Sequence, residues 1–203
     1  GNSRESLFAA NLNADTETVR RGKSFDEKRQ FPLSLTTTDR STPLNFKGVE
    51  YRMEDSKISG GRRIIYSDKP MNITIPRFDE GRVTVSVAPP LYYIVPPQYK
   101  DVIERLKVHG IKFTTLANPH TLEVESYKLT EPKWATNSFE NRITVSAKQA
   151  AIKETRTYAA GSVLIPMDQE AANVAVHLLE PNGPDSFLYW GFFNSIFEQK
   201  EGG

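Results

Sequence analysis

Short runs in which apolar and polar residues alternate constrain this chain more than any other feature of its sequence. Val83, Val85 and Val87 would lie on one face of a strand, with Thr84 and Ser86 on the other. Pro, Gly, Asn and Asp separate such runs, as turns between strands require. This pattern favours antiparallel sheets. We therefore expect a mainly β fold, an antiparallel β-sandwich with two or three flanking helices, with an α+β fold as the alternative.

Further runs rich in β-branched and aromatic residues have the same texture and are also expected to be strands. The predicted strands are Lys47–Met53, Arg63–Tyr66, Asn72–Ile75, Arg82–Val87, Leu91–Val95, Lys112–Leu116, Leu122–Leu129, Arg142–Ser146, Ile152–Tyr158 and Ser162–Ile165.

Three segments have apolar residues at helical spacing instead. Gly110 is placed to end the first of them, and Asp168 and Asp185 are placed to cap the other two. The predicted helices are Pro97–His109, Gln169–Leu179 and Ser186–Glu198.

The first thirty residues differ from the rest because they are polar and charge-rich, with few large apolar side chains. We interpret residues 1–30 as a linker or a docking segment, possibly helical, since the apolar stripe is thin. Residues 31–203 are expected to form one β-sandwich-like domain.

Composition excludes several classes of function. The 26 basic and 25 acidic residues give a net charge of +1, so no nucleic-acid partner is indicated. No run approaches the roughly 18 apolar residues of a membrane span. Without cysteine the chain has no disulfide and no thiolate chemistry. It opens at Gly1 with neither Met nor a signal peptide, so we expect a fragment of a longer protein.

One spacing of residues invites a metal-site hypothesis. His120 and Glu123 read H-x-x-E, and His177 could supply a third zinc ligand. Glu123 begins an alternating strand, and two residues three apart on a strand point to opposite faces. A turn at Asn118-Pro119 would relax this objection. We nevertheless predict no metal site and no catalytic residue, and treat this set as a chance match.

Aromatic residues near the C-terminal end are the more informative feature. Phe187, Trp190, Phe193 and Phe197 fall within one predicted helix. Some of them should fill the core, and those left outside would form an interaction patch. We take these residues as the candidate docking surface. Such a patch could contact another protein domain, or its rings could stack on sugars.

Several segments together resemble the stretch that follows the catalytic domain in a group of bacterial carboxypeptidase A-like zinc peptidases. The similarity covers roughly residues 90–198 and keeps the order of the motifs. The matching segments are Tyr93–Gln98, Val102–Leu106, His109–Ile111, Ala160–Pro166, Asp168-Gln169, Leu178–Pro181, Asp185-Ser186 and Trp190–Phe193.

This resemblance implies a role without catalysis. In that family a zinc ion held by the catalytic domain polarises the scissile carbonyl and activates water, and those motifs do not map onto this chain. The resemblance implies that residues 31–203 are a C-terminal accessory domain, that zinc belongs to a missing catalytic domain, and that the protein is periplasmic or extracellular. The implied partners are the catalytic domain of the same chain and a peptide or cell-wall peptide. A carbohydrate- or peptidoglycan-binding module is the alternative.

Overall fold

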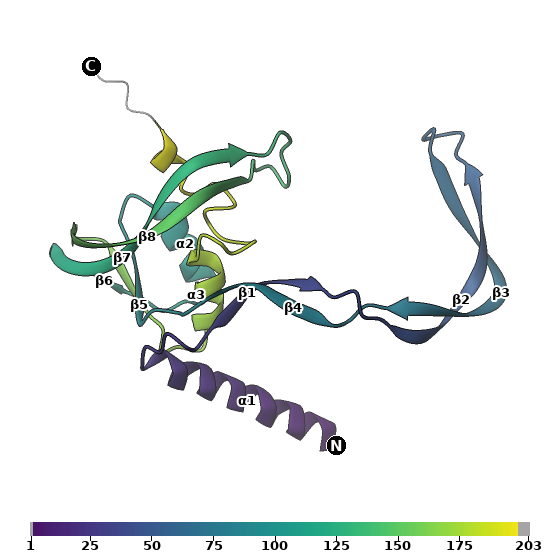
Figure 1. Ribbon diagram of the computed structural model, residues 1–203, viewed down its shortest axis with the longest axis horizontal. Coiled ribbons are helices and arrows are strands. Elements are labelled where there is room, and N and C mark those ends of the chain that lie inside the picture. Colours follow the sequence, from purple (N-terminus) through teal and green to yellow (C-terminus); the bar gives the residue numbers. More distant parts are fainter. Residues whose placement is uncertain (1, 199–203) are drawn as a thin grey trace. The chain divides into compact units, whose positions relative to one another are not determined.

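The computed structural model describes residues 2–198 (Figure 1). Contacts within the chain group its residues into two units. Unit 1 combines the residues up to Ser34 with those from Thr84 onward, and unit 2 is Leu35–Val83. Within these residues the strands form four sheets of two or three strands each, accompanied by three α-helices. The mainly β fold with two or three helices is thus confirmed. Since no sheet within residues 2–198 exceeds three strands, α+β describes the arrangement better than a sandwich of two large sheets.

The core of unit 1 is built on a three-stranded sheet. Its order is β5 (Tyr92–Val95), β9 (Val163–Pro166) and β6 (Thr114–Thr115), and both pairings are antiparallel. Apolar residues of this sheet and of two helices, α2 (Lys100–Val108) and α3 (Ala172–Leu179), fill one cluster. Fully buried members include Val102, Leu106, Val163, Ile165, Ala175 and Val176.

Helix α2 ends as its sequence predicts. Gly110 adopts φ +73° and donates its N–H to the carbonyl of Lys107, while the N–H of Ile111 reaches Leu106. These two bonds form a Schellman motif, in which glycine accepts the left-handed conformation at little cost. Ile111 is buried behind it, which fixes the chain that leaves the helix.

Helix α3 begins later than expected, and Asp168 is not its cap. The N-cap is Ala171, which makes no side-chain capping bond. The reason lies one residue after Asp168. The buried amide of Gln169 donates to the carbonyls of Pro166 and Lys112 and accepts the N–H of Lys112, at 2.6, 2.9 and 2.7 Å. These bonds hold Gln169 outside the helix.

Helix α1 (Asn2–Gly22) lies within the segment interpreted as a linker or docking segment. Leu7, Phe8 and Leu12 are exposed along it. Its last residue approaches the main chain near α3 closely: a Cβ at Gly22 would lie 1.8 Å from the carbonyl oxygen of Met167. Only glycine fits there. None of the helices in residues 2–198 combines the length and apolar character that crossing a membrane requires.

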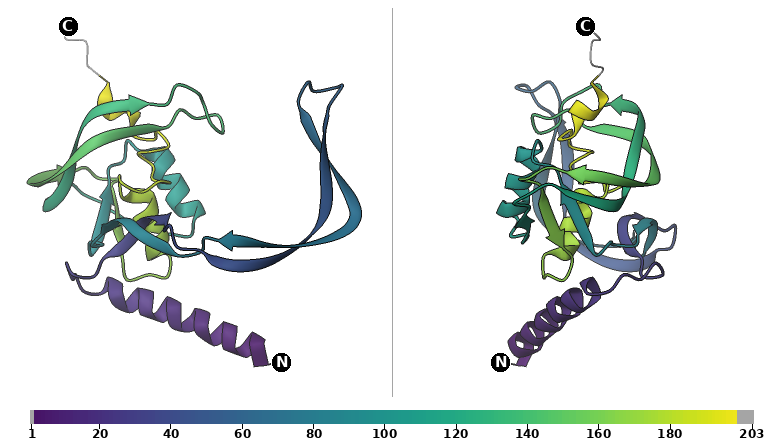
Figure 2. Two further views of the ribbon diagram at one scale, coloured as in Figure 1. Left: turned by 45° about the vertical axis from the view of Figure 1, so that its right-hand side comes forward. Right: turned by 90° about the vertical axis from the view of Figure 1, so that its left-hand side faces the viewer.

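A long two-stranded ribbon completes unit 1. Strand β7 (His120–Trp134) pairs with β8 (Val145–Tyr158), with an irregularity between Thr130 and Lys133. The ribbon is strongly curved in both views of Figure 2. The sequence predicted two separate strands here, Arg142–Ser146 and Ile152–Tyr158. The structure has one continuous strand from Val145 to Tyr158 instead, because no glycine or proline interrupts residues 147–151.

Unit 2 contains a second long ribbon, which we call the arm. Strand β2 (Thr42–Asp55) pairs with β3 (Arg62–Arg77), and the register shifts between Val49 and Tyr51. The arm turns sharply partway along its length (Figure 1). Strands β1 (Phe31–Thr37) and β4 (Gly81–Val87) pair with each other in a further two-stranded sheet.

The predicted helix Ser186–Glu198 is wrong. Residues after Ser186 form turns, and only Asn194–Phe197 make a short 3₁₀-helix. Gly191 (φ +75°) causes the break. Its N–H bonds to Leu188, and the next N–H bonds to Phe187, which ends a single helical turn.

Candidate functional site

His120, Glu123 and His177 are not arranged as the ligands of one metal ion. His120 and Glu123 are exposed residues of β7, and their odd separation on this strand places them on opposite faces. His177 lies on α3, where its ring packs edge-on against Phe31 at 5.0 Å. Within residues 2–198 the structure holds no group of three or more histidine or carboxylate side chains suited to a metal ion.

Two hollows of unit 1 are candidate ligand sites. The cavity between α1, Phe31 and α3 has a volume of ≈ 60 Å³, which suits ordered water rather than a substrate. An open hollow on the β7–β8 ribbon contains Glu123 and Glu125. These carboxylates share one strand face, whereas the paired carboxylates of glycosidases flank the bond that they cleave.

The predicted docking residues divide between the core and the surface. Phe187 is only 3% exposed and belongs to the core cluster. Phe193 packs against that cluster and meets Tyr99 edge-on at 4.8 Å. Trp190 and Phe197 are half-buried. These last two lie beside aromatic residues from another part of the chain.

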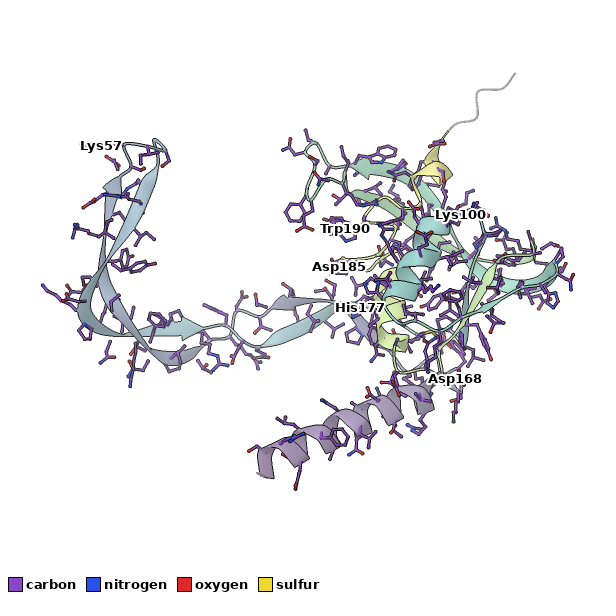
Figure 3. All side chains as sticks on the ribbon, turned by 180° about the vertical axis from the view of Figure 1, so that it is seen from behind. Lys57, Lys100, Asp168, His177, Asp185 and Trp190 are labelled. Carbon is purple, nitrogen blue, oxygen red and sulfur yellow. The ribbon has the colours of Figure 1, made fainter. Side chains whose placement is uncertain are left out.

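An aromatic patch forms where the C-terminal turns meet the end of the β7–β8 ribbon. Trp190 stacks on Phe139 (6.2 Å, 27°) and meets Tyr189 edge-on at 5.6 Å, while Phe197 meets Trp134 edge-on at 5.9 Å. The two groups are joined through Val145, which pairs with Trp134 and donates its N–H to Tyr189. The side chain of Trp190 is labelled in Figure 3, which draws all described side chains as sticks. We define the aromatic patch as Trp134, Phe139, Tyr189, Trp190 and Phe197.

Several members of the aromatic patch face solvent. Phe139 is 63% exposed, Trp134 48% and Tyr189 37%. Trp and Tyr are enriched among the few residues that carry most of the binding energy in protein interfaces. The nearby Ile143 and Ile196 are exposed as well, which widens the apolar area.

Two arginines hold the backbone beneath the patch. The guanidinium groups of Arg105 and Arg142 both lie over the ring of Phe192, at 4.5 and 3.8 Å from its centroid. Arg142 also donates to the carbonyl of Trp190 at 3.1 Å. Cation–π contacts at such distances are worth about 0.5–2 kcal/mol each. Helix α2, the loop after β7 and the C-terminal turns are thereby fixed to one another.

A buried carboxylate fixes the ribbon that carries Trp134. Glu180 follows α3 and is 4% exposed. It accepts hydrogen bonds from the hydroxyls of Tyr93 on β5 (2.5 Å) and Tyr127 on β7 (2.9 Å). Burial raises the pKa of Glu180, and the two hydroxyls offset part of that effect. Burial and the neighbouring carboxylate likewise raise the pKa of both tyrosines.

Sequence reasoning missed Trp134, Phe139 and Tyr189 as members of the patch. Trp134 and Phe139 are more than fifty positions away from Trp190, so only the folded ribbon brings them together. The local signal was a pair of large aromatic residues flanking a turn-rich stretch, Ala135–Ser138, at the end of a strand. Tyr189 was visible within the aromatic run.

Comparisons with known proteins find relatives that match part of the chain. Carboxypeptidase 2 of Trichophyton tonsurans is 29% identical over 102 residues, which is 50% of this chain and 19% of that protein. Carboxypeptidase 2 of Trichophyton rubrum is 28% identical over the same length, with the same coverage of both chains. Probable carboxypeptidase 2 of Arthroderma benhamiae is 27% identical over 96 residues, or 47% of this chain and 18% of that protein.

These matches support a carboxypeptidase-like region in the chain. The matched stretch spans about a fifth of the length of these curated relatives. The relatives named above are fungal, whereas the resemblance in the sequence was to a bacterial group. No family model matches the chain, and no solved structure matches it.

Proposed function

We propose that this chain is a non-catalytic accessory region of a larger carboxypeptidase-like protein, and that the aromatic patch contacts the catalytic domain of that protein. The similarity to carboxypeptidase 2 proteins, which extends over half of this chain, supports the association with carboxypeptidases. The observation that carries the docking role is the exposure of Trp134 and Phe139 on an otherwise well-anchored surface.

The anchoring matters for binding. A surface that is already ordered loses little conformational entropy when a partner binds. Arg105 and Arg142 hold the turns below the patch, and Glu180 ties the β7–β8 ribbon to the core. The patch would therefore contribute most of its apolar burial to affinity.

The finer parts of the proposal follow from the resemblance. The chain would lie C-terminal to the catalytic domain and support it or shape access to its cleft. Zinc and the catalytic residues would belong to that domain, which would act on a peptide or cell-wall peptide. The whole protein would be periplasmic or extracellular.

Binding between separately purified chains tests this role. The parent's peptidase domain would be titrated with this chain in a calorimeter. Phe139→Ser should weaken binding by about tenfold or more, because an interface anchor of this size is worth at least ~1.4 kcal/mol. The matched control is Tyr92→Ser, which removes an aromatic side chain of similar exposure elsewhere on unit 1. If the unmodified chain and both variants bind the peptidase domain with equal affinity, the docking role is contradicted. The absence of binding by the unmodified chain would contradict it as well.

A carbohydrate-binding module is the second candidate. The stacked pair Phe139–Trp190 is the observation that favours it, because a partly exposed aromatic ring is a platform for a sugar ring. Sedimentation of the chain with insoluble peptidoglycan would support this candidate if Phe139→Ser abolished it. A chain that stays in the supernatant with every polysaccharide tried would remove it.

A further inference from the structure

The arm has apolar side chains that nothing in its own unit covers. In its inner half, Leu44 lies opposite Ile75, Phe46 opposite Ile73, and Gly48 opposite Met71. Directly opposed residues of an antiparallel pair share one face. In the outer half, Tyr51 lies opposite Tyr66 and Met53 opposite Ile64, and the tyrosine rings are 6.5 Å apart. Each half of the arm therefore has an apolar face.

Charged residues dominate the other face of the arm, whereas Arg77 and the pair Asp55–Arg62 stand at the ends of the apolar faces. The outer half pairs Glu54 with Arg63, and Glu54 also binds Arg52, through contacts of 3.2 and 2.8 Å. In the inner half, Lys47 lies opposite Asn72. Since successive residues of a strand alternate between faces, these groups point away from the apolar pairs.

A two-stranded ribbon of this kind has little stability without further packing. None of the residues Leu35–Val83 is buried. Isolated two-stranded hairpins are at best marginally stable in water, because they lack a second layer that would bury their apolar face. Within residues 2–198, the outer edges of β2 and β3 also have no ladder partner over 14 and 16 residues. Long unprotected edges of this type invite another chain.

The exposed apolar area matches one side of a protein interface. Leu44, Phe46, Tyr51, Met53, Ile64, Tyr66 and Ile73 are each between 38% and 68% exposed. Together they present on the order of 700 Å², since large apolar and aromatic side chains have roughly 200 Å² of surface. Standard interfaces bury about 800 Å² on each partner.

We propose that the apolar faces of the arm bind the arm of a second copy of this chain, forming a two-fold symmetric dimer. In such a dimer the same surface is used on both copies, so it must be complementary to itself. The opposed apolar pairs at the middle of each face meet that condition, because they bring no like charges together, and the charged residues on these faces stand at their ends: Arg77 on the inner half and the oppositely charged pair Asp55–Arg62 on the outer half. The pairing of two arms also gives each the second layer that it lacks.

The dimer is independent of the proposed docking of the aromatic patch. The arm consists of Thr42–Arg77, whereas the patch residues lie from Trp134 onward. Failure of one proposal therefore leaves the other standing.

Analytical ultracentrifugation of the chain provides the first test. We expect a dimer at micromolar concentration. Ile73→Lys places a charge on the apolar face and should weaken self-association by about tenfold or more. Thr74→Lys is the matched control, because Thr74 is the exposed neighbour on the opposite face and should leave the dimer intact. A monomeric parent chain at 100-fold higher concentration (roughly 10⁻⁴ M) would overturn the proposal.

A cross-linking test locates the contact between two copies on one face of the arm. The chain has no cysteine, so one introduced thiol is unique. Met71 lies on the apolar face of the inner half, opposite Gly48, so Met71→Cys should form a disulfide-linked dimer on mild oxidation. Asn72→Cys, on the opposite face, should stay monomeric under denaturing electrophoresis. Trp134 and Trp190 both belong to unit 1, so tryptophan fluorescence verifies that unit 1 is folded in every variant. Equal cross-linking of the two variants, or none in either, would contradict the arm-to-arm contact.

Discussion

At the scale of single residues, Glu180 combines burial with two hydroxyl donors. Burial raises the folded-state pKa of Glu180 above its unfolded value of about 4.5. The folded chain therefore binds more protons than the unfolded chain between these two pKa values, and its stability falls as pH rises through that window. We expect the free energy of unfolding of the parent chain, measured relative to Glu180→Gln, to decrease as pH rises from 4.5. Urea denaturation at a series of pH values measures this difference.

A surface variant controls for the general effect of net charge. Glu123→Gln removes one exposed carboxylate from β7. The free energy of unfolding of Glu123→Gln, measured over the same pH range, shows how much of the change comes from the loss of one negative charge alone. Tyr127→Phe gives a second check, because removing one donor to a buried carboxylate should cost about 1–3 kcal/mol. A Glu180→Gln profile parallel to that of the parent chain would show that the carboxyl does not titrate as its burial requires.

At the scale of elements, the alternation of side chains identified the strands because half-buried ribbons need one apolar and one polar face. Strand β4 differs by one residue from the predicted Arg82–Val87. The pattern could not show that β2 and β3 extend beyond the predicted runs, since an exposed ribbon keeps its hydrogen bonds without burying every second residue. The predicted helix at Ser186–Glu198 fails at Gly191, where φ is +75° and an added Cβ would lie 3.2 Å from the carbonyl oxygen of Ile143, a residue distant in sequence.

Helix α1 offers an element-scale prediction at Gly22. In an unconstrained helix, Gly→Ala stabilises by up to ~1 kcal/mol. Here the added Cβ would lie 1.8 Å from the carbonyl oxygen of Met167, and a main-chain atom must move to make room. We expect Gly22→Ala to lower the stability of unit 1 and to increase amide exchange along α1. Ser6→Ala, on the exposed part of the same helix, supplies the control for helix propensity. Slower exchange in Gly22→Ala would mean that the close approach is absent in solution.

At the scale of the whole molecule, the aromatic patch shows where sequence reasoning ends. Trp190 and Phe197 could be selected from the aromatic run, and Phe187 could not be distinguished from them, although it lies in the core. Whether each ring faces inward depends on the path of turns around Gly191 and on a ribbon that is distant in sequence. Such contacts are set by tertiary packing, not by periodicity.

The division into two units leads to a prediction about the independence of their stabilities. Every member of the core cluster lies in unit 1, and no residue of Leu35–Val83 is buried. Strands β1 and β4 are paired, so a two-residue Asn-Gly turn could join Ser34 to Thr84 as a hairpin. We expect this shortened chain to keep the thermal midpoint of the unmodified chain within about 2–4 °C, the shift that ~1 kcal/mol produces in a domain of this size.

Fluorescence of Trp134 and Trp190 follows that transition, because both belong to unit 1. The matched control replaces Leu106, a fully buried residue of α2, with Ala in the full-length chain. Loss of this side chain should cost about 2–5 kcal/mol and lower the midpoint clearly. If removing the arm destabilised unit 1 as much as Leu106→Ala does, the core of unit 1 would depend on the arm, and the arm could not serve solely as a binding element. If the midpoint is kept, unit 1 folds without the apolar faces of the arm, and those faces are free to serve as a binding element.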